Sequence, residues 1–282
     1  MTTYALTGTT GHFGQVAMQL LAQQVGAEHV VALARRVDKA QALVPAGVTV
    51  RAGDYDDLAQ LTAALQGVDR LLFVSSQPGG PVSRQQQHAN VVAAAQAAGV
   101  SYIAYTSFPQ AATSTAPLAA DHQATEKAIQ ASGLKYSFLR NNWYLENEAA
   151  TLKAAANGEP FVYAAGDGQV GWALESDYAE AAVKVLTAAN PKAIYEFAGP
   201  MRTYQDLAAA VPGDFAVQAV DAQTYAQGLE ATGMPTAVAE LVTSIQMLIR
   251  AGQLQETTTD LPDVLGRAVT PLTPAMQKVI GA

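Results

Sequence analysis

A glycine-rich segment near the start of the chain has the residue types that bind phosphate groups. It reads Gly8-Thr9-Thr10-Gly11-His12-Phe13-Gly14, between an apolar stretch at residues 3–7 and apolar residues at helical spacing. The first glycine permits a tight turn, the second lets the backbone approach a pyrophosphate, and the third lets a helix pack closely on a sheet. The N–H groups of that helix would then face the phosphates. Glycine triplets also occur in ordinary turns, but this position between a strand and a helix favours a dinucleotide-binding site.

The end of the second expected strand carries arginine at the point where a carboxylate is usual in NAD-binding proteins. An Asp or Glu there accepts hydrogen bonds from the adenosine ribose and favours NAD. This chain has Ala34-Arg35-Arg36 instead, with Lys39 close by in the sequence. Because a guanidinium group can hold a 2′-phosphate through two donors, Arg35 favours NADP. The alternative is a pair of solvated arginines at the end of a strand.

Polar residues also follow the next three expected strands. Asp54 follows the third strand, near which an adenine usually lies, and it fits equally well as the N-cap of the following helix. Ser75, Ser76 and Gln77 end the fourth strand, and Thr106 lies at the end of the fifth. Because the carboxyl ends of parallel strands meet at one edge of a sheet, we expect residues 75–77 and Thr106 to border the ribose and nicotinamide.

Strands and helices alternate along the first half of the chain, which indicates parallel βαβ units with right-handed crossovers. The six expected strands cover residues 3–7, 29–34, 48–52, 70–74, 102–106 and 136–139. They predict an α/β fold with a Rossmann-like doubly wound parallel sheet, whose ligand lies beyond the carboxyl ends of the strands. From residue 141 onward, glycines and prolines interrupt the pattern. We therefore expect an NADP-binding Rossmann domain at 1–150, to which residues about 169–190 return, and a smaller, discontinuous C-terminal α/β substrate domain at 151–282.

The composition excludes several other classes of protein. The 282 residues carry a net charge of −8, so nonspecific binding to nucleic acid or anionic lipid is not expected. The chain has no cysteine and its four histidines lie far apart, so neither disulfides nor a metal site is expected. No basic region precedes an apolar stretch at the start, and no apolar run is long enough for a membrane span. We therefore expect a cytoplasmic protein.

The residues from Leu139 to Asn147 read Leu-Arg-Asn-Asn-Trp-Tyr-Leu-Glu-Asn, and they are the most specific signal of a known family. The other segments that carry the likeness are Gly8–Gly14, Arg35, Gly53-Asp54-Tyr55, Tyr105-Thr106-Ser107, His122 with Glu126-Lys127, and Ala164–Gly168. Together they resemble the NmrA-like atypical short-chain dehydrogenases and, among these, the bacterial NADPH-dependent quinone oxidoreductases of type 2. The resemblance covers almost the whole chain and weakens after about Gly199.

The resemblance implies a cofactor, a substrate and the residues that hold them. NADPH would bind with its phosphates on residues 8–13, its 2′-phosphate on Arg35 and its nicotinamide half near residues 75–77, without a metal or a flavin. Ala173 matches a position that contacts the cofactor through its backbone. A quinone would lie against Asn141, Asn142, Trp143, Tyr144, Leu145 and Glu146. The family often has glycine at the position of Asn142, and the region after Gly199 could form a cap, a homodimer surface or both.

The acid that short-chain dehydrogenases use on alcohols and ketones is missing here. They carry Tyr-x-x-x-Lys, whereas this chain has Gln123 four residues before Lys127, and glutamine cannot act as an acid. Reduction of a quinone needs less help, because hydride addition gives a resonance-stabilised oxyanion. Lys127 would hold the nicotinamide ribose, and Trp143 and Tyr144 offer flat faces to a planar ring. We take Lys127 and Tyr144 as the catalytic candidates. Lys127 could instead be a surface lysine, and Trp143 and Tyr144 could be buried aromatics at a domain junction. For His122 we expect a structural role.

The function that these features favour is NADPH-dependent transfer of hydride to a quinone. Two alternatives stay open: an NADP(H)-binding redox sensor without turnover, and a reductase of another carbonyl or imine substrate. The retained lysine and the aromatic segment favour turnover.

Overall fold

The main sheet of the protein consists of seven parallel strands. In the computed structural model, which describes residues 1–281, their order is β3-β2-β1-β4-β5-β6-β8. The strands are β1 (Tyr4–Leu6), β2 (Val30–Ala34), β3 (Thr49–Ala52), β4 (Arg70–Phe73), β5 (Tyr102–Ser107), β6 (Lys135–Asn141) and β8 (Ile194–Phe197). Tyr4 pairs with Val30 on one side and with Arg70 on the other, so the direction of winding reverses between β1 and β4. The predicted doubly wound Rossmann-like sheet is confirmed.

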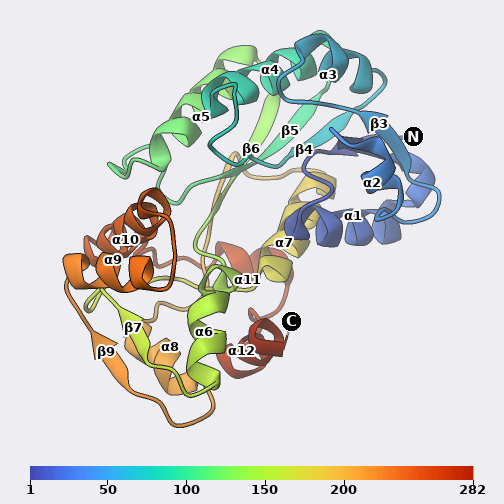
Figure 1. Cartoon of the computed structure of the whole chain (residues 1–282). Coiled ribbons are helices and arrows are strands. Elements are labelled where there is room, and N and C mark those ends of the chain that lie inside the picture. Colours follow the sequence, from blue (N-terminus) through green and yellow to red (C-terminus); the bar gives the residue numbers. More distant parts are fainter. Residues whose placement is uncertain (282) are drawn as a thin grey trace.

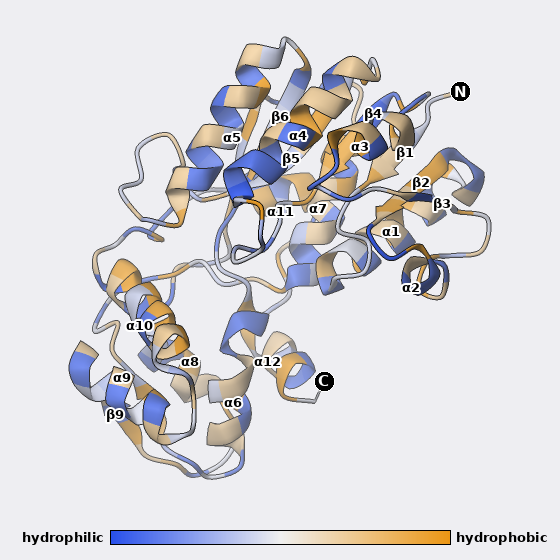
Figure 2. Ribbon diagram, turned by 45° about the horizontal axis from the view of Figure 1, so that its top comes forward, coloured by the Kyte–Doolittle hydropathy of each residue, from blue (hydrophilic) through white to orange (hydrophobic). Residues whose placement is uncertain are grey.

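Helices cover both faces of this sheet (Figure 1). One face packs against α1 (His12–Val25), α7 (Glu175–Thr187) and α11 (Asp260–Leu265), and the other against α3 (Leu58–Ala64), α4 (Arg84–Ala97) and α5 (Ala119–Ser132). The short helices η1 (Ala27–His29) and α2 (Val37–Gln41) flank β2. Neighbouring residues of a strand enter opposite cores, as Ala5 and Leu6 do, because side chains alternate along a strand. Figure 2 shows hydrophobic residues concentrated in the strands of this sheet.

A smaller part of the chain has its own core. It contains η2 (Leu145–Glu148), α6 (Ala149–Ala156), β7 (Phe161–Tyr163), α8 (Tyr204–Ala210), β9 (Val217–Ala219), α9 (Ala222–Ala231), α10 (Thr236–Arg250) and α12 (Leu272–Gly281). Strands β7 and β9 form a separate parallel pair. We call this part the small unit, and the seven-stranded sheet with its helices the main unit.

The chain returns to the main unit for longer than the sequence suggested. Helix α7 lies within the expected segment of residues 169–190, but β8 also pairs with β6 and α11 also packs on α7. A strand at residues 193–197 is indicated by the sequence, but both elements are short, and only their pairing and packing across the fold assign them to the main unit. In residues 1–281, no helix combines the length and the apolar character that crossing a bilayer requires.

Candidate functional site

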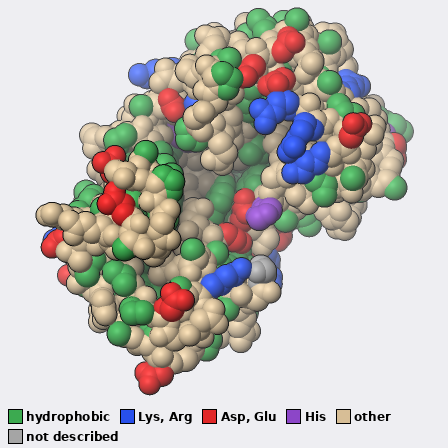
Figure 3. Space-filling model, viewed as in Figure 1, with side chains coloured by type: hydrophobic (Ala, Val, Ile, Leu, Met, Phe, Trp, Pro, Cys, Tyr) green, Lys and Arg blue, Asp and Glu red, His purple; other side chains and the backbone are tan. Residues whose placement is uncertain are grey.

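The strand ends of the main unit face the small unit across a hollow. Figure 3 shows this hollow, with Lys and Arg side chains gathered at its rim on the main unit and acidic side chains beside a histidine within it. The polar residues that the sequence singled out lie after β1, β2, β3 and β4 and at the carboxyl ends of β5 and β6, as the parallel topology requires.

The glycine-rich turn after β1 leaves its outer side open. Gly8 has a φ of +68°, and a Cβ on Gly14 would lie 2.1 Å from the Gly8 carbonyl oxygen, so α1 packs directly on the turn. A Cβ on Gly11 would meet nothing closer than that same oxygen at 3.5 Å. The Thr9 hydroxyl donates to the Leu33 carbonyl at 3.2 Å and fixes the turn against β2. At Gly11 the backbone therefore leaves room for the close approach of a phosphate group.

Exposed basic side chains follow β2. Arg35, Arg36 and Lys39 are all exposed, and no salt bridge joins any of them to a carboxylate within residues 1–281. Their guanidinium and ammonium groups are thus available to an anionic ligand.

Asp54 does not cap the helix that follows it. The N-cap of α3 is Asp57, whose carboxylate accepts the Gln60 backbone N–H at 2.9 Å. Asp54 accepts instead from the Asp56 N–H at 3.2 Å, and its own N–H is bound to the side chain of Gln60. The interpretation of Asp54 as an N-cap is therefore wrong, and its contact with an adenine stays a prediction.

The loop after β4 is held by two residues that the sequence did not single out for this role. The Ser76 N–H donates to Nε2 of His88 at 3.0 Å, and Nε of Arg84 donates to the Ser76 carbonyl at 2.7 Å. Burial, with a smaller effect from Arg84, lowers the pKa of His88 to about 3, so the ring stays neutral and accepts. The Ser75 N–H is bound to the Thr106 hydroxyl at 2.9 Å. His88 stands alone on α4, and apart from the rarity of histidine in this chain no sequence pattern marked it for this role.

A buried acceptor without a partner lies at the end of β6. Asn141 donates through Nδ2 to the Tyr144 hydroxyl at 2.9 Å, while its Oδ1 has no hydrogen-bond partner in the described residues. The Tyr144 ring stacks on Phe13 with centroids 6.3 Å apart. Burial raises the pKa of Tyr144, so its phenol stays protonated at neutral pH. An unpartnered acceptor at the carboxyl end of the sheet fits a ligand that carries an N–H donor, such as a carboxamide.

Two of the expected substrate residues are buried and bonded within the fold itself. Asn142 is buried, donates to the Leu254 carbonyl and accepts the Gly171 N–H. Leu145 is 1% exposed within the core of the small unit. Trp143 and Tyr144 do not form one wall, because Trp143 packs on the core of the small unit and Tyr144 on that of the main unit. The expectation that all of residues 141–146 line the substrate is therefore wrong for Asn142 and Leu145.

Lys127 lies elsewhere than the sequence suggested. Its side chain is exposed on the outer face of α5, whereas His122, Thr125 and Glu126 of the same helix are buried against the sheet. One residue turns a helical side chain by about 100°, so Glu126 takes the inward position. We therefore correct the assignment of Lys127 to the catalytic and cofactor sites.

The side chains of Gln123 and His122 on α5 are both bound within the fold. The Gln123 amide donates to the Ser114 carbonyl at 2.8 Å. The His122 ring contacts the Tyr105 hydroxyl at 2.9 Å and a guanidinium nitrogen of Arg84 at 3.2 Å, and burial lowers its pKa well below the usual value. These contacts favour a structural role for His122.

The backbone of Ala173 contacts the aromatic segment. It pairs with Tyr144 as an isolated bridge, and its carbonyl accepts the Leu145 N–H at 2.9 Å. Contact of this backbone with a cofactor stays a prediction.

A buried carboxylate that the sequence did not reveal lies behind Trp143. Glu148 accepts from the Tyr204 hydroxyl at 2.9 Å and from the indole N–H groups of Trp143 and Trp172 at 3.1 and 3.4 Å. No cation forms a salt bridge with it in the described part of the chain. Burial raises the pKa of Glu148 from 4.5 to about 6.

We expect the substitution Glu148→Gln to flatten the dependence of stability on pH. Because the folded pKa of Glu148 lies above the unfolded one, its favourable contribution is complete below about pH 4.5 and is lost as the pH rises through about 6. The buried charge therefore costs about 2 kcal/mol at pH 8. Urea unfolding at pH 4.5 and 8 measures this difference. The exposed carboxylate Glu159 gives the matched control, since Glu159→Gln should keep the wild-type dependence; an unchanged dependence in Glu148→Gln would contradict the expectation.

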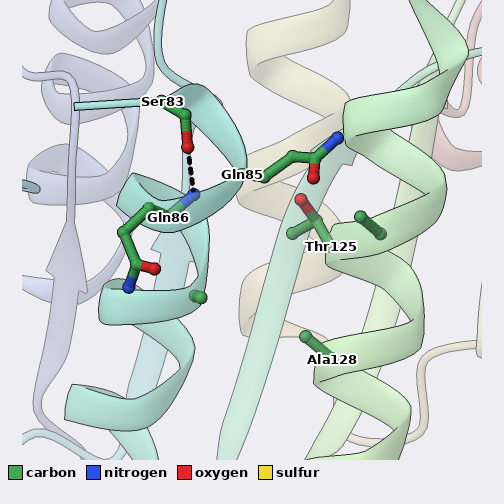
Figure 4. A pocket seen from close by; sticks show the side chains of 7 residues that line it. Ser83, Gln85, Gln86, Thr125 and Ala128 are labelled. Carbon is green, nitrogen blue, oxygen red and sulfur yellow. Dashed lines mark hydrogen bonds between the residues drawn. The ribbon is translucent and has the colours of Figure 1, made fainter. Parts of the chain in front are cut away.

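Two surface grooves lie away from these strand ends. One, of about 330 Å³, lies between α4 and α5 and is lined by Ser83, Gln85, Thr125 and Ala128 among others (Figure 4). Another, of about 580 Å³, includes Arg70 and Tyr102 at the opposite ends of the strands. No group of three His, Asp or Glu side chains in residues 1–281 is arranged to hold a metal ion. The candidate site is therefore the hollow at the carboxyl ends of the strands.

Comparison with known proteins agrees with this location. Residues 8–192 match a family model described as NAD(P)H-binding. The chain is 40% identical over 274 residues to quinone oxidoreductase 2 of Escherichia coli strain K12, with 95% of each chain covered. The crystal structure of the NADPH-dependent quinone oxidoreductase of E. coli complexed with NADPH has a TM-score of 0.92 at 39% identity, covering 98% of this chain and 99% of that one. Triphenylmethane reductase of Citrobacter complexed with NADP(H) gives 0.92 at 34% identity, with 98% and 99% covered. The chain therefore belongs to the NAD(P)H-binding family, and the NmrA-like resemblance of its sequence is confirmed.

Proposed function

We propose that the protein is an NADPH-dependent reductase that transfers hydride to a quinone. Two observations carry the proposal: the open turn at Gly11 and the unpartnered Oδ1 of Asn141, which lie at the carboxyl ends of β1 and β6 in the same sheet. The chain also resembles a quinone oxidoreductase over 95% of its length. The likeness to a reductase of triphenylmethane dyes supports a conjugated aromatic acceptor as the substrate class. We further propose a cytoplasmic location and leave the homodimer as a prediction.

The residues that would hold the cofactor fit its chemistry. The N–H groups of His12 and Phe13 would face the phosphates, because that of Gly11 donates to the Gly8 carbonyl within the turn. Arg35 would hold the 2′-phosphate, and Asn141 would accept from the carboxamide of the nicotinamide. Ser75, Ser76 and Thr106 would border the ribose. His88 and Arg84 hold Ser76, and the Thr106 hydroxyl accepts the Ser75 N–H. The bound cofactor supplies the hydride.

The chain's own part in the reaction is positioning and electrostatic support. The Tyr144 hydroxyl, which stays protonated, can donate a hydrogen bond to the oxyanion of the reduced quinone, while Asn141 orients it. Phe13 and Tyr178 hold the Tyr144 ring from two sides. Because the oxyanion is resonance-stabilised, this support replaces the missing general acid.

Steady-state oxidation of NADPH with and without a simple benzoquinone tests the proposal. We expect quinone-dependent oxidation that saturates with quinone concentration. Tight NADPH binding without turnover for any quinone would favour the redox sensor instead, and turnover with carbonyl or imine substrates alone would favour a different reductase.

We expect Arg35→Ala to remove the preference for NADPH over NADH. A charge-assisted pair with the 2′-phosphate contributes roughly 1.5–3 kcal/mol, so the wild type should bind NADPH at least about tenfold more tightly than NADH. Titration of both cofactors by fluorescence measures the ratio. Lys127→Ala, on the outer face of α5, is the control and should keep the preference. Equal affinities for both cofactors in the wild type would contradict the assignment of Arg35.

A further inference from the structure

The N-terminus of α1 is already bound by a carboxylate of this chain. The Phe13 N–H donates to Oε1 of Glu175 at 3.0 Å, and the Glu175 N–H, at the start of α7, donates to Oε2 of Glu146 at 2.9 Å. Each of the two helices thus begins against a carboxylate from another element, which the positive end of a helix dipole favours. The Phe13 amide is also one of the groups that an incoming phosphate would use.

The pair Glu146 and Glu175 carries negative charge that few neighbouring groups offset. Neither Glu146 nor Glu175 has a salt-bridge partner in the described residues, and His12 of α1 is the one basic group that lowers the pKa of both. The phenol of Tyr144 stays neutral beside them. On α7 itself, Asp177 is bound by Arg267 at 2.9 Å. Two carboxylates therefore stand where the dinucleotide would bring further negative charge, and Figure 3 shows acidic side chains beside a histidine in the hollow.

The two carboxyl groups also bind protons more readily than exposed ones. Burial raises the pKa of Glu146, and burial together with the charge of Glu146 raises the pKa of Glu175. Phosphate groups placed beside them would raise both pKa values further, because like charges disfavour ionisation.

We propose that Glu175 competes with the cofactor phosphates for the Phe13 amide, and that Glu175 and Glu146 together set the cofactor affinity and couple binding to proton uptake. This inference rests on the proposed function. When the cofactor enters, the Glu175 carboxylate leaves the amide or takes a proton from solvent. Affinity for NADPH then falls as the pH rises, because deprotonated carboxylates oppose the phosphates.

Titration of NADPH between pH 6 and 8.5 tests the proposal with four proteins: the wild type, Glu175→Gln, Glu146→Gln and, as the control for loss of a remote charge, Glu159→Gln. Glutamine keeps an acceptor for the amide but removes the charge. We expect Glu175→Gln to bind NADPH on the order of tenfold more tightly at pH 8 and to show a flatter pH dependence. Glu146→Gln should shift the affinity in the same direction by a smaller factor, and Glu159→Gln should match the wild type.

Calorimetry in buffers of different ionisation enthalpy gives a second measurement. The wild type should take up more protons on binding NADPH than Glu175→Gln does, and the titration of the 2′-phosphate cancels in this comparison. Equal affinity and proton uptake in the two proteins, or weaker binding by Glu175→Gln, would overturn the inference while leaving the proposed function intact. If Glu175→Gln does not fold, Glu146→Gln decides by the same criteria. Absence of NADPH binding in all four proteins would overturn the cofactor site and the inference together.

Discussion

Gly11→Val is expected to weaken NADPH binding at least about a hundredfold while the protein stays folded. Gly11 has φ −85° and ψ 166°, an extended conformation that valine adopts readily. Its Cβ would meet only the Gly8 carbonyl, at 3.5 Å, so the branched side chain would point into the space of the pyrophosphate. Loss of two charge-assisted hydrogen bonds of about 1.5 kcal/mol each gives the expected factor. Fluorescence titration and circular dichroism measure the two effects.

Gly14→Ala is the matched variant, with the opposite expected result. A Cβ at this position would lie 2.1 Å from the Gly8 carbonyl oxygen and 2.9 Å from the Thr9 Cα, both backbone atoms that cannot move aside cheaply. We expect a loss of stability of about 3 kcal/mol or more, measured by urea unfolding. A Gly11→Val protein that folds and binds NADPH normally would show that the phosphates lie elsewhere.

Glu126→Ala is expected to lower the free energy of unfolding by about 3 kcal/mol, because it leaves a buried guanidinium group short of its partner. Arg140 donates to both oxygens of Glu126, at 2.9 and 2.7 Å, and the Ser107 hydroxyl donates to the same carboxylate at 2.6 Å. The remaining bond from Arg140 to Glu196, at 2.8 Å, keeps the effect at the lower end of the range for broken buried pairs.

The neighbouring residue supplies the control for this prediction. Lys127 is exposed on the outer face of α5, so Lys127→Ala should change the stability by less than about 0.5 kcal/mol. Equal and small losses in the two variants, measured by urea unfolding, would show that the buried ion pair contributes little.

The sequence predicted those parts of the protein whose signals are local. The turn at Gly8–Gly14 and the alternation of strands and helices through β6 depend on neighbouring residues, and the parallel sheet that they imply is present. The placement of Arg35 after β2 follows from the same local pattern. Strand order and the location of the hollow then follow from topology.

The errors arose where a side chain's direction depends on distant packing. Lys127 and Glu126 are adjacent in sequence, and only the packing of α5 on the sheet decides that the glutamate faces inward. Asn142 and Leu145 lie in a segment that resembles a substrate site, yet both form hydrogen bonds within the protein, with residues 171–173 and 254. The carboxylates of Glu148 and Glu175 gave no sequence signal, because their partners come from remote elements.

The way the chain completes its main sheet bears on how the protein is synthesised. Strand β8 and helix α11 come from residues 194–265, yet β8 pairs with β6 and α11 covers α7. Until these residues leave the ribosome, the nascent chain carries an unpaired strand edge at β6, and such edges can pair with other chains. The sheet therefore gains its last strand only late in translation, and a chain that ended at residue 150 would expose the edge of β6 to such pairing.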